Sequence, residues 1–194
     1  MMGDRDRNRD RLSGLSSSVC SCGIPHMAHR IVGGKPAGVH EYPWQVGLIT
    51  PGTQQPWCGG TIISHQHILT AAHCTHGMTI PDINVLLGEH DTTDSTATVF
   101  KIVKITDHPQ FNINQMHYDY SILTLDHYFN FTLQMSPVCL PTDVFTTYSD
   151  KIAKVTGWGL TKSGGEQSTT LLEVDLKVLT NHECTIHYSG DIKG

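Results

Sequence analysis

The sequence predicts an all-β protein. From Ile31 onward, short runs rich in Val, Ile and Thr are separated by clusters of Gly, Pro, Asn and Asp, which are the residues of turns. No helical stretches alternate with these runs, and this argues against a parallel α/β sheet. Many short strands joined by turns are typical of a sandwich or a barrel.

Eight runs have the composition of strands, and each is bounded by turn residues. In chain order they are 44–49 (WQVGLI), 59–64 (GGTIIS), 67–72 (HILTAA), 83–88 (INVLLG), 98–105 (TVFKIVKI), 120–125 (YSILTL), 151–159 (KIAKVTGWG) and 171–179 (LLEVDLKVL). Residues 181–184 (NHEC) resemble the start of a short helix. Residues 108–115 and 161–169 are polar and rich in turn residues, so we expect exposed loops there.

Composition limits the classes of partner. The 194 residues include 18 acidic and 13 basic side chains, a formal charge of −5, so there is no basic field for nucleic acid. No run approaches the ~18 apolar residues of a membrane span. The first thirty residues are polar and irregular, and their alternating Asp and Arg do not form an export signal.

The cysteines indicate an oxidising compartment. They stand at positions 20, 22, 58, 74, 139 and 184, spread along the chain rather than grouped in C-x-x-C pairs, which favours long-range disulfides over a zinc ribbon. Asn130 begins the triplet Asn-Phe-Thr, an acceptor for N-glycosylation and a weak support for secretion. Since no export signal is visible, we expect the chain to start inside a longer precursor.

The hexapeptide LTAAHC (69–74) leaves three roles open for His73: a catalytic base, a metal ligand, or a core imidazole at the end of a strand. The nearby HQH (65–67), taken with His73 and His76, suggests zinc, because alternate residues of a strand share a face, but nothing else supplies a fourth ligand at a typical spacing. After Glu89 the carboxylates Asp91 and Asp94 are too few for a calcium loop. We therefore expect neither a metal ion nor a cofactor.

Six motifs together carry a resemblance to a known family. They are RIVGG (30–34), WCGGTIIS (57–64), LTAAHC (69–74), DYSILTL (119–125), PVCLP (137–141) and TGWG (156–159). In this order, and from Arg30 to the last residue, the sequence resembles the trypsin/chymotrypsin family of serine endopeptidases. The resemblance implies two antiparallel six-stranded β-barrels with the active site in the crevice between them. Residues 1–30 would then precede a peptidase domain of residues 31–194.

The same resemblance assigns roles to two of these residues. It implies that His73 is the general base and that Asp119 is the carboxylate that orients it. The chemistry fits, because a serine hydroxyl is a poor nucleophile until an imidazole, with its ordinary pKa of ~6.5, takes the proton. Asp119 also stands before a strand run, where an aspartate is common for structural reasons alone.

Activation and disulfides are likewise implied by the resemblance. Cleavage between Arg30 and Ile31 by an activating trypsin-like protease would free the Ile31 amino group, which would pair with a buried carboxylate. Cys58 would pair with Cys74 and Cys22 with Cys139, so that the segment before Arg30 stays tethered. Cys20 and Cys184 would be without partners in this chain. The implied partners are polypeptide substrates, the activating protease and protein inhibitors.

The family's nucleophile motif, Gly-Asp-Ser-Gly-Gly-Pro, does not occur in the sequence. Residues 189–194 (SGDIKG) contain Gly-Asp with no serine after it. We therefore expect a complete first barrel (31–137), a partial second barrel (138–194) and no hydrolysis by this chain alone. Two functions follow: a secreted serine endopeptidase represented by an incomplete chain, or a non-catalytic homologue that binds a partner protein.

Overall fold

The structure is a computed structural model, and it describes residues 21–26, 35–94, 97–143, 145–162 and 164–187 of the chain. Its strands are β1 (Lys35–Pro36), β2 (Gln45–Ile49), β3 (Cys58–Ile62), β4 (His67–Thr70), β5 (Asn84–Leu87), β6 (Thr98–Asp107), β7 (Ser121–Leu125), β8 (Ile152–Gly157) and β9 (Leu172–Lys177). Its helices are α1 (Ala72–Thr75), the 3-10 turn η1 (Ile80–Asp82) and α2 (Asn181–His187).

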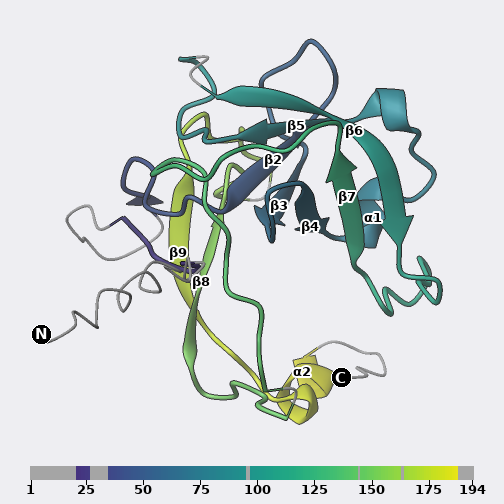
Figure 1. Cartoon of the computed structure of the whole chain (residues 1–194). Helices are drawn as coiled ribbons and strands as arrows, with labels where there is room; N and C mark the ends of the chain where they lie inside the picture. Colours follow the sequence, from purple (N-terminus) through teal and green to yellow (C-terminus); the bar gives the residue numbers. More distant parts are fainter. Residues whose placement is uncertain (1–20, 27–34, 95–96, 144, 163, 188–194) are drawn as a thin grey trace, which may run out of the picture.

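Six of the strands close into an antiparallel barrel in the order β2-β3-β4-β7-β6-β5. The other three form a separate sheet in the order β1-β9-β8. In Figure 1 the barrel occupies the upper part of the view, and β8 and β9 descend from it toward α2. The predicted fold class, with a complete first barrel and a partial second one, is confirmed.

The interior of the barrel holds the main hydrophobic core. Along β7 the side chains alternate between buried and half-buried, and Leu123 and Leu125 are fully buried. Phe100 and Ile102 enter the same core from β6. The remaining buried members come from the other strands and their ends, and they are Val46, Leu48, Ile62, Ile68, Cys74, Ile83, Val85, Leu87 and Phe129.

Strand β2 forms the wall between the barrel and the second sheet, because all five of its residues are buried. Val46 and Leu48 belong to the barrel core. On the other side of the strand, the Gln45 side-chain oxygen accepts a hydrogen bond of 2.6 Å from the hydroxyl of Thr156 in β8. A residue larger than Gly47 would not fit, since an added Cβ would lie 2.7 Å from Pro56 Cγ.

The second sheet is covered only where it meets the barrel. There a small core of Ala37, Tyr42, Trp158 and Leu171 forms, and the Trp158 ring nitrogen donates to the backbone oxygen of His90 at 3.2 Å. Farther out, the register of β8 and β9 places Ala153, Val155, Val174 and Leu176 on one face. Val155 and Leu176 are each 50% exposed, so within the described residues this apolar face is uncovered.

One predicted strand is shorter in the structure than expected, and one predicted helix is present. The expected strand at 67–72 ends at Thr70, and Ala72 instead begins helix α1, so that part of the prediction was wrong. The expected helical start at 181–184 is present as α2, where Thr180 and Glu183 hydrogen-bond to each other's backbone N–H groups. In the described part of the chain, no helix is both long enough and apolar enough to cross a membrane.

Candidate active site

Two neighbouring strands bring His73 and Asp119 to the same end of the barrel. Strand β4 pairs antiparallel with β7, and Thr70 at the end of β4 lies opposite Ser121 at the start of β7. His73 follows β4 within the helical turn α1, and Asp119 precedes β7. The closed barrel therefore joins two residues that are 46 positions apart in the sequence.

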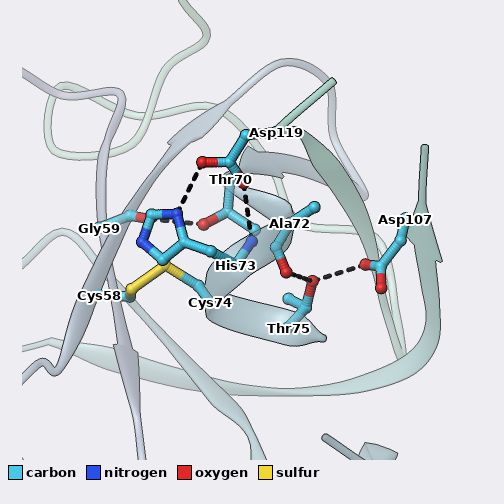
Figure 2. Close-up of polar contacts among 9 residues, drawn as sticks. All are labelled: Cys58, Gly59, Thr70, Ala72, His73, Cys74, Thr75, Asp107 and Asp119. Carbon is cyan, nitrogen blue, oxygen red and sulfur yellow. Dashed lines mark hydrogen bonds and ion pairs between the residues drawn. A yellow bond between two sulfur atoms is a disulfide. The ribbon is translucent and has the colours of Figure 1, made fainter. Parts of the chain in front are cut away.

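Asp119 holds His73 by two hydrogen bonds, which Figure 2 shows as dashed lines. The ring atom Nδ1 of His73 lies 2.7 Å from Asp119 Oδ2, and the backbone N–H of His73 donates to Asp119 Oδ1 at 2.7 Å. An ionised carboxylate can only accept a hydrogen bond, so Nδ1 carries the hydrogen and donates it to Asp119, and in the neutral imidazole the other nitrogen, Nε2, has a free lone pair. The pair thus presents Nε2 as a base.

The environment of the pair favours an ionised aspartate next to an accessible imidazole. Burial opposes ionisation of Asp119, but the hydrogen bonds from the ring and backbone of His73 outweigh it and hold the pKa of Asp119 below its ordinary value. The side chain of Asp119 is 24% exposed and that of His73 is 45% exposed. A substrate can therefore reach the imidazole, while the carboxylate is partly shielded.

Contacts from helix α1 to β6 and β3 fix the position of His73, and the sequence did not predict them. The Thr75 hydroxyl donates to Asp107 Oδ1 in β6 at 2.6 Å and also lies 3.2 Å from the Ala72 oxygen. The disulfide Cys58–Cys74 ties the next residue of the helix to β3 (Figure 2). Thr75 stands directly after the LTAAHC motif, but nothing in the sequence points to Asp107.

The backbone before Asp119 is in an unusual conformation. Tyr118 has a φ of 55°, in the left-handed region that costs a bulky residue roughly 1–2 kcal/mol. Its ring stacks on His108 with a centroid distance of 4.7 Å, and its backbone oxygen accepts from Tyr120 N at 2.8 Å. This turn delivers Asp119 to His73, and no sequence signal announces it.

On the Nε2 side of His73, the described residues supply a sulfur atom and no serine hydroxyl. Cys74 Sγ lies 3.4 Å from His73 Nε2. Cys58, His73 and Cys74 also form the one group of three or more His, Cys, Asp or Glu residues in the described chain whose ligand atoms lie within 4.8 Å of each other. Since both sulfurs are in a disulfide, they cannot act as thiolate ligands or as nucleophiles.

A pocket of about 180 Å³ adjoins this disulfide, between the barrel and the second sheet. Cys58 and Trp57 line it from the barrel side, and Thr156, Trp158 and Gln167 line it from the other side. The pocket therefore lies at the junction of the two sheets, where the resemblance implies an active-site crevice.

Of the other predicted residues, Arg30, Ile31 and Cys20 lie outside the described residues. Cys22 and Cys139 form a disulfide, as do Cys58 and Cys74, and both pairs are those that the resemblance implies. Among the described cysteines, Cys184 has a free thiol. Asn130 is exposed in the segment after β7.

The sequence is similar to a protein family and to proteins of known class. The family model described as Trypsin matches residues 31–194. A venom serine protease of Polistes dominula is 37% identical over 181 residues, covering 89% of this chain and 64% of the wasp protein. A trypsin of Saccharopolyspora erythraea is 35% identical over 159 residues, covering 81% of this chain and 68% of the bacterial protein.

A solved structure supports the fold alone. Neuropsin, described as a serine protease expressed in the limbic system of mouse brain, superposes with a TM-score of 0.74 at 24% identity. The match covers 84% of this chain and 71% of the neuropsin chain. The chain thus spans less than two thirds of the length of the Polistes dominula protease and most of the length of the neuropsin chain.

Proposed function

Since the chain belongs to the trypsin family of serine proteases, we propose that it acts in peptide-bond hydrolysis, with His73 as the general base and Asp119 as the carboxylate that orients it. The observation that carries this proposal is the pair of 2.7 Å hydrogen bonds from Asp119 to the ring and the backbone of His73. A ring held in this way has one orientation and one tautomer, as the family's mechanism requires.

In this mechanism His73 Nε2 takes the proton of a serine hydroxyl as the oxygen attacks the substrate carbonyl. Asp119 stabilises the imidazolium that forms, and the proton then passes to the leaving amine. We infer that the serine belongs to a segment outside residues 1–194, because the family's Gly-Asp-Ser-Gly-Gly motif is absent from the printed sequence. By this account residues 1–194 alone hydrolyse no peptide bond.

Activation is the second part of the proposal. Cleavage after Arg30 would convert a zymogen into the form that starts at Ile31. The disulfide between Cys22 and Cys139 supports this order of events, since it would keep the released segment attached to the domain. The proposed partners are an activating trypsin-like protease, polypeptide substrates and protein inhibitors.

Secretion is proposed on two grounds. The described residues contain two disulfides, which form and persist in oxidising compartments. A relative of similar sequence is a venom protein.

Limited trypsin digestion tests the activation step. The digest of the whole chain should contain a new amino terminus, Ile31-Val32-Gly33-Gly34, read by amino-terminal sequencing. Arg30→Gln should abolish it, and Arg30→Lys should retain it, because trypsin accepts either cation. A different new terminus, or an unchanged cut in Arg30→Gln, would reject the zymogen proposal.

The transcript distinguishes the two candidate functions. A coding region that continues past Gly194 into a Gly-Asp-Ser-Gly-Gly stretch would support the endopeptidase. A stop codon directly after Gly194 would favour the second candidate, a non-catalytic homologue that binds a protein through exposed surfaces such as the apolar face of β8 and β9.

A further inference from the structure

The segment that follows β7 is anchored on both sides of Asn130. The backbone N–H of Phe129 donates to the His65 oxygen at 3.1 Å, and Phe129 is only 7% exposed. Phe131 stacks on the His65 ring with a centroid distance of 3.7 Å and an interplanar angle of 12°. Asn130 therefore lies between two aromatic residues that face inward.

This anchoring turns Asn130 outward. Burial alternates along the segment, with Tyr128 exposed, Phe129 buried, Asn130 exposed and Phe131 half-buried. In the described part of the chain the Asn130 side chain has no hydrogen-bond partner, and the segment belongs to neither a helix nor a strand. The carboxamide is accessible in the folded domain and is not needed to hold the structure.

The triplet Asn130-Phe131-Thr132 has the form Asn-x-Thr with x other than proline, and it is the one such triplet in the sequence. The Thr132 hydroxyl oxygen accepts from the backbone N–H groups of Gln134 and Met135 at 3.2 and 3.1 Å. A turn therefore begins directly after the acceptor, so the triplet lies at the surface in an irregular segment, which is the usual setting of an occupied site.

From this placement we propose that Asn130 carries an N-linked glycan. The side-chain nitrogen Nδ2 forms a bond to the anomeric carbon of the first N-acetylglucosamine of a lipid-pyrophosphate-linked oligosaccharide. The carbon–oxygen bond to the pyrophosphate breaks, its electron pair leaves with the lipid pyrophosphate, and one amide proton passes to a base of the transferase. The modification requires entry into the secretory pathway and so rests on the proposed secretion.

The glycan is at the end of the barrel remote from the candidate active site. At one end of the β4–β7 pair, Thr70 lies opposite Ser121, next to His73 and Asp119. At the other end His67 lies opposite Thr124, and the adjoining residues His65 and Phe129 are hydrogen-bonded. Because the strands separate Asn130 from His73, the glycan leaves access to the imidazole unchanged.

Tyr128 provides a surface for the first sugar. It stands two residues before Asn130, on the same side of the extended segment, and the residue is 74% exposed. Leu133, beyond the acceptor triplet, is also 74% exposed. An aromatic ring with a polar tip can pack against the apolar face of a sugar while its hydroxyl stays in water. The glycan would thus cover apolar surface that this segment otherwise exposes.

The test expresses the full chain behind a heterologous signal peptide in mammalian cells, and both the protein secreted into the medium and the protein retained inside the cells are analysed. Wild type should shift in mobility on treatment with peptide N-glycosidase F, which converts the glycosylated asparagine to aspartate at position 130. Asn130→Gln and Thr132→Ala should abolish the shift, whereas Thr132→Ser should keep it.

The absence of a shift in wild type would overturn the glycan and leave the proteolytic proposal intact, since the signal peptide is supplied. A second comparison tests Tyr128. Tyr128→Ala should lower the Tm of the glycosylated protein more than that of the enzymatically deglycosylated protein. An equal change in the two forms would reject the contact between Tyr128 and the sugar.

Discussion

Replacing Asp119 by alanine removes both hydrogen bonds that fix His73, and we expect the free energy of unfolding to fall by about 3 kcal/mol. A hydrogen bond to a charged group contributes about 1.5–3 kcal/mol, and the 24% exposure of Asp119 places each bond at the lower end of that range. Asp119→Asn keeps one acceptor oxygen, for the His73 backbone N–H, and should lose only about half as much. Urea unfolding followed by circular dichroism measures both losses.

The same carboxylate makes part of the stability depend on pH. Because the folded-state pKa of Asp119 lies below its unfolded value of ~3.9, its contribution is fully present above that value. The contribution is lost as the pH falls through the folded-state pKa. Other carboxylates, such as Asp91, have lowered pKa values for other reasons, so the informative quantity is the difference between wild type and Asp119→Asn. That difference should shrink toward acid pH.

A second His–Asp pair, directly after β7, is the matched control. His127 Nδ1 lies 2.7 Å from Asp126 Oδ1, but the two side chains are 62% and 33% exposed. A pair this exposed to water contributes little, so Asp126→Ala should change the stability by less than about 1 kcal/mol. If Asp119→Ala costs no more than Asp126→Ala, the argument that Asp119 rigidly fixes His73 is refuted.

Three further predictions concern the fold. Replacing both cysteines of Cys22–Cys139 by serine should cost ~5 kcal/mol on loop entropy, against ~3 kcal/mol for Cys58–Cys74, since the bridges span 117 and 16 residues; equal losses in urea unfolding would contradict this. Leu123→Ala, at a fully buried position of the barrel, should cost about 2–5 kcal/mol, and a loss below 1 kcal/mol would show that the core is not packed as described. Val155→Thr, on the uncovered face of β8, should raise the solubility limit without lowering the Tm; a lower Tm would mean that this face is covered.

The strands could be predicted because their evidence is local. The run at 98–105 lies within β6, and the run at 120–125 contains β7, since β-branched composition and flanking turns act over a few residues. The run at 67–72 failed at its end because tertiary contacts decide the outcome there. Thr75 bonds to Asp107 and Cys74 is tied to β3, and these contacts favour a helical turn over continued strand.

The candidate site was predictable only in part, for a related reason. His73 and Asp119 were identified from their motifs, and the cysteine pairs followed from the resemblance and not from the spacing. The pairing of β1 with β9 joins residues far apart in the chain, so no local pattern shows it. The left-handed backbone at Tyr118 is also set by surrounding contacts rather than by residue type, because tyrosine has no preference for that conformation.

The central claim is that His73 and Asp119 form the base and orienting residues of a triad whose serine lies outside residues 1–194. The most direct test is the fraction of protein labelled by a serine-directed phosphonylating probe, read by intact mass after trypsin activation. We compare residues 1–194 with the same chain extended by its own downstream coding sequence, and each of these with its His73→Ala variant. We predict no labelling of residues 1–194 and labelling of the extended chain that His73→Ala abolishes. Labelling of residues 1–194 at any serine, or labelling of the extended chain that persists in His73→Ala, would contradict it.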